Sequence, residues 1–258
     1  MQNNTFSGLF IGQNIVILNE IASTNTYLKD ALSKSTPFLE GTVIMAENQY
    51  GGRGQTKNVW QSEAGKNLTF SILLNPSFLS VDKQFDLNKA ISLALNDVLT
   101  TYFGNSAKIK WPNDLYINRE KIGGMLIENI VQGNRIKHAI IGIGLNVNQT
   151  QFSSDVKNVT SFKKILHTDY DLQTLLADIC KAVEARYLQL KAGKIKEITT
   201  AYIQKLYLIN EWSTFRINTD LNDGKITGVS AEGYLQVEIE NKIKQFDFKE
   251  IEFIHTVK

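Results

Sequence analysis

The amino-acid sequence predicts an α+β protein, with strands and helices interspersed up to about Asn210 and only short strands after it. Apolar residues recur at helical spacing over residues 82–103 and 171–190, which supports the helices of the first part. After Asn210, short alternating runs are separated by turns expected at residues 222–224, 232–233 and 240–241, a pattern typical of a small β-barrel or sandwich. We therefore expect one domain over residues 1–210 and a second over residues 211–258.

Apolar alternation predicts strands near residues 15–18, 42–46 and 67–74. In the last of these, alternate side chains point to one side: Leu68, Phe70, Ile72 and Leu74. Residues 125–148 predict two more strands joined at residues 132–134. A last helix is expected over residues 194–208.

The second strand of that pair carries Gly142 and Gly144 in its interior. Glycine within a strand indicates close packing or the approach of a ligand. Cys180 borders the apolar face of the helix over residues 171–190, so we expect a buried structural thiol there and no nucleophile.

The most specialised stretch is a predicted hairpin over residues 107–126. Its first strand ends at Trp111, and Pro112 begins a turn because proline lacks a backbone donor and restricts the preceding residue. Asn113 and Asp114 therefore stand where a strand stops, a place that projects polar groups into a cleft. A carboxylate that merely caps a turn is the alternative for Asp114.

The tip of this hairpin is expected at residues 118–120, and Lys121 opens its second strand. Gly123 and Gly124 follow without side chains, so another group can approach the backbone there. Taken alone, Lys121 reads as a solvated surface lysine.

Composition excludes several classes of protein. The chain has 258 residues, 43% of them hydrophobic, and a formal net charge of +2, so no overall field attracts nucleic acid or membrane. One Cys and three scattered His give neither a disulfide framework nor metal-ligand spacing. With neither a secretory leader nor a long apolar run, we expect a soluble cytoplasmic protein.

Two further polar segments are candidates for binding. Residues 23–25, Ser-Thr-Asn, precede a helical pattern, and only one of them is needed as a helix N-cap. Residues 51–54, Gly-Gly-Arg-Gly, lie in the longest polar connection, where backbone N–H groups and Arg53 can hold an anion. A mobile surface loop is the alternative. Trp60, which closes the loop, is either a core aromatic or a flat face for a ring.

Together these motifs resemble the biotin–protein ligases, the biotin–[acetyl-CoA-carboxylase] ligases. The resemblance covers nearly the whole chain and rests on residues in a fixed order: Ser23-Thr24-Asn25, Gln49-x-x-Gly52-Arg53-Gly54, Trp60, Lys110-Trp111-Pro112-Asn113-Asp114, Lys121, Gly123-Gly124 and Gly142-Ile143-Gly144-Leu145-Asn146-Val147-Asn148. It implies a mixed β-sheet with flanking helices, related to class II aminoacyl-tRNA synthetases, plus an SH3-like C-terminal domain. Because the pattern begins by Ile15, we expect the monofunctional type without a DNA-binding domain.

The resemblance also implies roles for individual residues. It assigns catalytic roles to Lys121 and Arg53, and it assigns no metal ligands. The implied biotin-binding residues are Ser23, Thr24, Asn25, Gln49, Gly52, Arg53, Gly54, Gln55, Lys121, Gly123 and Gly124. The implied nucleotide-binding residues are Trp60, Asn113, Asp114, Lys121 and Asn146.

The family reaction uses biotin and ATP as substrates, with Mg²⁺, and an acceptor lysine on a biotin carboxyl carrier protein or domain. The first step brings two anions together, so we expect positive charge to dominate catalysis. Neither DNA nor a membrane is implied as a partner, and the expected state is a monomer or homodimer.

One departure affects the loop. Many members of the family carry arginine where this chain has Gln55 and Asn58; Lys57 adds charge but lacks the fork of a guanidinium. Two rival functions remain open: a lipoate or octanoate ligase or transferase of the same fold, and a protein that only binds biotin or docks the carrier.

Overall fold

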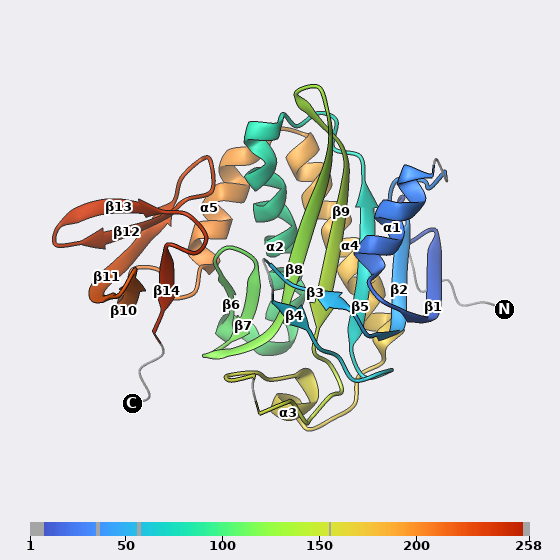
Figure 1. Ribbon diagram of the computed structural model, residues 1–258, viewed down its shortest axis with the longest axis horizontal. Helices are drawn as coiled ribbons and strands as arrows, with labels where there is room; N and C mark the ends of the chain where they lie inside the picture. The colour runs from blue at the N-terminus through green and yellow to red at the C-terminus, as the bar shows by residue number, and fades with distance from the viewer. Residues whose placement is uncertain (1–7, 35–36, 56–57, 155, 255–258) are drawn as a thin grey trace.

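The protein is described by a computed structural model that covers residues 8–34, 37–55, 58–154 and 156–254. Its largest element is a seven-stranded sheet in the order β1-β2-β5-β9-β8-β7-β6 (Figure 1). β1 and β2 run parallel and the other neighbours are antiparallel, so the sheet is mixed, as expected. The strands are β1 Ile15–Ile21, β2 Val43–Gln49, β5 Leu68–Leu74, β6 Ala107–Lys110, β7 Asp114–Ile117, β8 Glu120–Gln132 and β9 Arg135–Leu145.

Helices cover both faces of this sheet (Figure 1). α1 (Thr24–Ser33) packs on β5 and β9 from one side. α2 (Gln84–Phe103) lies on the other side, against β6 and β7, and α4 (Leu172–Lys191) and α5 (Ile195–Lys205) pack on α2. The sheet is therefore the middle layer of the part of the chain that precedes residue 210.

The central strand β5 shows why the layers form. All seven of its residues are buried, and the predicted alternation is confirmed. Leu68, Phe70, Ile72 and Leu74 join the large apolar core on the α2 side, whereas Leu73 joins a smaller cluster with Leu28 of α1. Because successive side chains of a strand point to opposite faces, one apolar strand supplies both cores.

The helix boundaries differ slightly from the sequence expectations. α2 begins two residues later than expected, after a 3-10 turn η1 at Val81–Lys83, and a second turn η2 follows at Gly104–Ser106. α5 is shorter than the expected helix because the chain turns extended at Leu206. A short helix α3, Phe162–Leu166, was not predicted. Cys180 is buried as expected, and burial raises the pKa of its thiol to about 12.

The hairpin over residues 107–126 is confirmed, with β6, a turn at residues 111–113, and a second turn at Asn118 between β7 and β8. β8 runs on as one strand through Gln132 and pairs with β9 along its length. The residues just after Lys121 therefore pair with the segment of β9 that contains Gly142 and Gly144. This pairing places the predicted motifs side by side.

The Gly-rich connection is not wholly irregular. Gly52–Arg53 (β3) pairs with Val59–Trp60 (β4) to make a small hairpin, which we name the β3–β4 hairpin. It crosses in front of β8 and β9 (Figure 1). Lys57 lies outside the described residues.

After residue 210 the chain forms a five-stranded antiparallel sheet in the order β13-β12-β11-β10-β14. Its strands are β10 Trp212–Ile217, β11 Asp220–Val229, β12 Leu235–Ile239, β13 Lys242–Phe246 and β14 Ile251–Phe253. The turn predicted at residues 222–224 is wrong: these residues lie inside β11. A Cβ on Gly224 would come within 2.8 Å of Val237, so this glycine serves close packing and not a turn.

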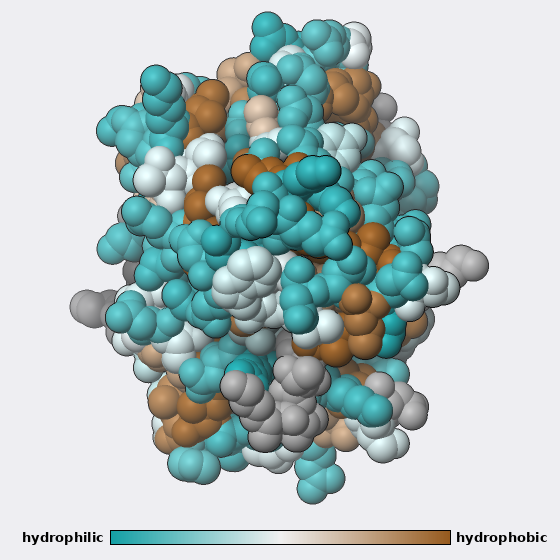
Figure 2. All heavy atoms as spheres, turned by 90° about the vertical axis from the view of Figure 1, so that its left-hand side faces the viewer, coloured by the Kyte–Doolittle hydropathy of each residue, from teal (hydrophilic) through white to brown (hydrophobic). Residues whose placement is uncertain are grey.

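Figure 2 shows the side of the molecule that carries this C-terminal sheet. Its surface is mostly hydrophilic, with separate apolar patches. The loop before β12 holds the sheet to the main body, because the Trp111 Nε1–H donates to the Gly233 carbonyl at 2.9 Å. Among the described residues, no helix is both long and apolar enough to cross a bilayer.

Candidate active site

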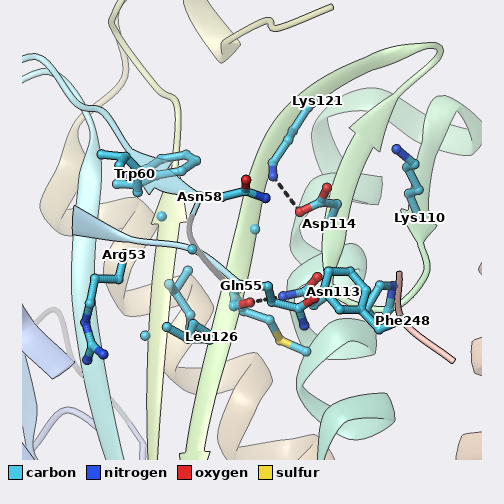
Figure 3. A pocket seen from close by; sticks show the side chains of 18 of the residues that line it. Arg53, Gln55, Asn58, Trp60, Lys110, Asn113, Asp114, Lys121, Leu126 and Phe248 are labelled. Atoms are coloured by element: carbon cyan, nitrogen blue, oxygen red, sulfur yellow. Dashed lines mark hydrogen bonds and ion pairs between the residues drawn. The ribbon is translucent and has the colours of Figure 1, made fainter. Parts of the chain in front are cut away.

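One cavity of about 560 Å³ collects most of the predicted residues. It lies where α1, the β3–β4 hairpin, the turn after β6 and the start of β8 meet, and residues 248–253 border it (Figure 3). This volume is typical of small-molecule sites. The predicted residues that line it are Ser23, Thr24, Asn25, Gln49, Arg53, Gly54, Gln55, Trp60, Asn113, Asp114, Lys121 and Gly124.

Three predicted residues are placed elsewhere. Asn146 lines a smaller neighbouring cavity that shares Trp60 and Lys121 with the first. Gly52 and Gly123 are not among the described lining residues of either cavity. Both support the walls instead: a Cβ on Gly52 would lie 2.4 Å from the Trp60 carbonyl oxygen, and one on Gly123 would lie 2.7 Å from that of Gly144.

At one end of the cavity a network of buried polar groups begins at the N-terminus of α1. Ser23 caps the helix, and its Oγ accepts from the Thr26 N–H. The Thr24 N–H donates to Gln49 Oε1 at 2.9 Å. Ser71 Oγ lies 2.7 Å from Thr24 Oγ1 and 2.6 Å from Asn25 Oδ1. The network fixes the polar groups that face the cavity, and we name Ser23, Thr24, Asn25 and Gln49 the polar shelf.

Gly142 explains how the polar shelf sits so close to the sheet. A Cβ at this position would lie 2.4 Å from Asn25 Oδ1, far inside any real contact. The close approach that the sequence predicted for this glycine is confirmed, and the approaching group is a side chain of the same protein.

Lys121 and Asp114 form the charged centre of the cavity. Lys121 Nζ lies 2.6 Å from Asp114 Oδ1, and both side chains are about one-third exposed or less. Gly124 makes room for this pair, because a Cβ there would lie 3.0 Å from Asp114 Oδ1 and 3.5 Å from Lys121 Nζ. Figure 3 shows the two side chains pointing toward each other from β8 and β7.

The backbone of Lys121 is held from two directions. β7 pairs with it at Tyr116, and on the other side Lys121 N–H donates to the Asn158 carbonyl at 2.7 Å while its own carbonyl accepts from the Thr160 N–H at 2.9 Å. Asn113 is tied to the same strand, since its amide nitrogen donates to the Met125 carbonyl and its carbonyl accepts from the Met125 N–H. The lysine therefore stands on a rigid base.

Trp60 and Asn146 carry polar atoms that lack a partner among the described residues. The Trp60 ring packs against β9, where a Cβ on Gly144 would come within 2.4 Å of it, and its buried Nε1–H has no acceptor among the described residues. Asn146 donates to the Thr160 carbonyl at 3.1 Å, yet its buried Oδ1 accepts no hydrogen bond from the described part of the chain. Buried polar groups are normally satisfied, so a donor and an acceptor left open beside a cavity indicate a polar ligand.

Arg53 points away from the charged centre (Figure 3). Its Nη2 lies 2.7 Å from Glu128 Oε2, which sits on β8 beyond the hairpin residues. Gln55 and Asn58, the positions without arginine, also line the cavity. Nothing in the sequence singles out Glu128.

Other contributors were given no role in the sequence analysis. Lys110 lines the cavity with its Nζ 5.1 Å from the Tyr116 ring centre and 5.0 Å from that of Phe253, and burial lowers its pKa. Residues 248 and 249 and the strand β14 reach the same wall. Among the described lining residues five are basic and two acidic, so the cavity favours anionic ligands. The basic residues are Arg53, Lys110, Lys121, Lys157 and Lys249, and the acidic ones are Asp114 and Glu252.

Comparisons with known proteins agree with this geometry. The bifunctional ligase/repressor BirA of Bacillus subtilis is 29% identical over 248 residues, which are 94% of this chain and 74% of that protein. The biotin–[acetyl-CoA-carboxylase] ligase of Paracoccus denitrificans is 33% identical over 130 residues, 49% of this chain and 53% of its own. The structure of the biotin protein ligase of Aquifex aeolicus in complex with biotin and ATP superposes with a TM-score of 0.79 at 26% identity, covering 95% of this chain and all of that one.

The sequence profile of the Biotin/lipoate A/B protein ligase family matches residues 18–146. This range is half of the chain and contains the polar shelf, the β3–β4 hairpin, the charged centre and Asn146. The chain therefore belongs to the Biotin/lipoate A/B protein ligase family.

Proposed function

We propose that this protein is a biotin–protein ligase. It activates biotin with ATP as biotinyl-5′-AMP and then transfers the biotinyl group to a lysine of a biotin carboxyl carrier protein or domain, in acetyl-CoA carboxylase or a related carboxylase. The observation that carries the proposal is the single cavity that joins the polar shelf, the Lys121–Asp114 pair and Trp60. Its support is the likeness, over nearly the whole chain, to a ligase solved with biotin and ATP.

In the first step a biotin carboxylate oxygen attacks the α-phosphorus of ATP. A new P–O bond forms, the bond to the β-phosphate oxygen breaks, and pyrophosphate leaves. Lys121 supplies positive charge where the two anions meet, and its rigid backbone keeps that charge in place, which lowers the cost of reorganisation. Asp114 Oδ1 lies 2.6 Å from the ammonium group and holds it in place.

We assign the two ends of the cavity to the two substrates. The polar shelf, together with Gly54, Gln55 and Gly124, forms the proposed biotin side, and Gly52 and Gly123 support its walls. Trp60, Asn113, Asp114 and Asn146 form the proposed nucleotide side, where the open Trp60 donor and Asn146 acceptor suit a heterocyclic base. Lys121 serves both, and Arg53 retains the activated intermediate. The mixed anhydride reacts with water, so a cover such as the β3–β4 hairpin is needed.

Mg²⁺ enters this scheme as part of the nucleotide substrate. The described residues contain no group of three or more His, Cys, Asp or Glu side chains that would hold a resident ion. Mg²⁺ is commonly bound by one or two carboxylates together with substrate phosphates, and Asp114 is the carboxylate at the charged centre.

In the second step the acceptor lysine nitrogen attacks the acyl carbon of biotinyl-AMP. An amide C–N bond forms, the C–O bond to AMP breaks, and the nitrogen loses a proton. We further propose a division into a catalytic domain, residues 1–210, and a C-terminal SH3-like domain, residues 211–258. The proposed setting is the cytoplasm, with a monomer or homodimer that needs no DNA; light scattering and a DNA mobility shift test these points.

Mass spectrometry of a carrier domain incubated with the protein, biotin and Mg-ATP tests the proposed function. We expect one added biotinyl group on one lysine, dependent on ATP. Unmodified carrier despite tight biotin binding would instead favour a protein that only binds biotin. Lipoate in place of biotin is the matched control, and preferential transfer of lipoate would favour the rival ligase of the same fold.

A further inference from the structure

The β3–β4 hairpin is short. Among the described residues it contains two strand pairs, Gly52 with Trp60 and Arg53 with Val59. Isolated two-stranded hairpins are marginally stable in water. Its base is fixed, because the Gly51 N–H donates to the Ala22 carbonyl at 2.9 Å. The side chain of Arg53, in β3, offers a second point of attachment.

Glu128 provides that attachment. Its Oε2 lies 2.7 Å from Arg53 Nη2, a charge-assisted hydrogen bond between the hairpin and β8. The glutamate side chain is 20% exposed and the arginine side chain 46%, so water weakens the pair without removing it. Arg53 is thereby turned away from Lys121 and Asp114, as Figure 3 shows.

Glu128 also touches the polar shelf. The same Oε2 accepts from Asn25 Nδ2 at 2.9 Å, and Asn25 is pressed against Gly142 and bound to Ser71. Lys29 adds a looser contact, 3.7 Å from Oε1. A hydrogen-bonded chain thus runs from Gln49 through the shelf to Glu128 and on to Arg53, and it links the floor of the cavity to its cover.

We propose that Glu128 is a positioning residue, which holds the β3–β4 hairpin over the cavity through Arg53 and so sets how long the activated intermediate stays bound. Arg53 then acts as an anchor of the hairpin, and its guanidinium is not the charge that meets the phosphate. The inference rests on the proposed function, because biotinyl-AMP is the intermediate that the hairpin retains.

A double-mutant cycle separates this role from direct contact with the anion. Arg53→Ala, Glu128→Gln and the double variant are compared by the rate at which preformed biotinyl-AMP leaves the protein. Glutamine still offers an oxygen to the Asn25 amide, so Glu128→Gln removes the negative charge that faces Arg53. We expect each single variant to release the intermediate about three- to tenfold faster, and the double variant to match the faster single one.

Glu238→Gln is the matched control. Glu238 is 25% exposed, pairs with Lys225 at 2.8 Å, and lies on β12, away from both cavities. It should leave the release rate unchanged. In Glu128→Gln, the rate of adenylate formation should change by a smaller factor than the rate at which biotinyl-AMP is released. A general loss of folding would not produce this difference.

Amide hydrogen exchange tests the anchor without any ligand. The Gly54 N–H donates to the Asn58 carbonyl at 2.8 Å inside the hairpin, and it should exchange several times faster in Arg53→Ala and in Glu128→Gln than in Glu238→Gln. Faster release in Arg53→Ala alone, multiplied effects in the double variant, or unchanged Gly54 exchange would overturn the proposal. A wild-type protein that forms no biotinyl-AMP would refute the proposed function, and the exchange result would still decide the anchor.

Discussion

Two hairpins face each other across the cavity, and they are built in opposite ways. The β7–β8 hairpin carries Lys121 inside a seven-stranded sheet, with backbone bonds to neighbours on both sides. The β3–β4 hairpin carries Arg53 on two residue pairs and one partly exposed ion pair. In the proposed function, the charge that must be placed accurately for chemistry sits on the rigid element, and the shorter hairpin is the one that opens for substrates.

Replacing Lys121 should produce the largest effect. We expect Lys121→Ala to lower the rate of adenylate formation by about 10²–10³-fold, because a fixed positive charge at the reacting groups is lost. Pyrophosphate release in single-turnover conditions measures this. The melting temperature should change little, since the Lys121–Asp114 pair is partly exposed. Near-normal pyrophosphate release by a folded variant would refute the assignment.

Adding one methyl group beneath Trp60 should affect the nucleotide side next most strongly. A Cβ at position 144 would lie 2.4 Å from the indole, so Gly144→Ala displaces the ring. Overpacking of this kind costs about 1–3 kcal/mol, and we expect the KM for ATP to rise about tenfold while that for biotin changes less.

Gly142→Ala is the matched control for that variant. Its new Cβ would collide with Asn25 of the polar shelf instead, so the KM for biotin should rise more than the KM for ATP. The same response in both variants would contradict the assignment of the two ends of the cavity.

Lys110, the last residue of β6, gives a pH-dependent test of the side of the cavity formed by the seven-stranded sheet. Burial lowers its folded-state pKa below the ordinary value of 10.5, so unfolding takes up protons in the pH range between the two. The stability of the wild type relative to Lys110→Met should therefore rise as pH increases through that range. The gain is about 1.4 kcal/mol for each unit by which the pKa is lowered. Urea unfolding at neutral and alkaline pH measures it, and a constant difference would show that burial of this ammonium costs nothing.

The smallest effect is expected at Lys29, which is 56% exposed and 3.7 Å from Glu128. Lys29→Ala should change the release of biotinyl-AMP by less than about twofold, because exposed ion pairs contribute little. An effect as large as that of Arg53→Ala would mean that the charge around Glu128, and not the short bond to the hairpin, controls retention.

The strands of the first part were predictable because their apolar alternation is strong. The run at Leu68–Leu74 and the hairpin at residues 107–126 lie where the pattern placed them. The C-terminal strands were predicted less well. β14, with three residues, is too short to show a period, and Gly224 looked like a turn because its packing against Val237 involves a strand distant in sequence.

The residues of the candidate site were likewise predictable only in part. Polar residues that follow or open predicted strands, such as Lys121, Asn113 and the shelf at residues 23–25, could be singled out from the sequence, and all of them line the cavity. Glu128 was not singled out, and Lys110 was quoted in a motif but given no role, since a charged residue within a strand reads as surface until its neighbours are known. Ser71 is similar: a small polar residue in an apolar strand says nothing of the Thr24 and Asn25 oxygens that it joins.

The sequence by itself determined the classes of element, the motifs and their order along the chain. These are local properties, since periodicity, turn chemistry and missing side chains act over a few residues. Only the tertiary structure decided which of the motifs meet. It turned Arg53 to Glu128, laid Trp60 on Gly144 and brought residues 248–253 to the cavity wall, because those contacts depend on packing between segments far apart in the chain.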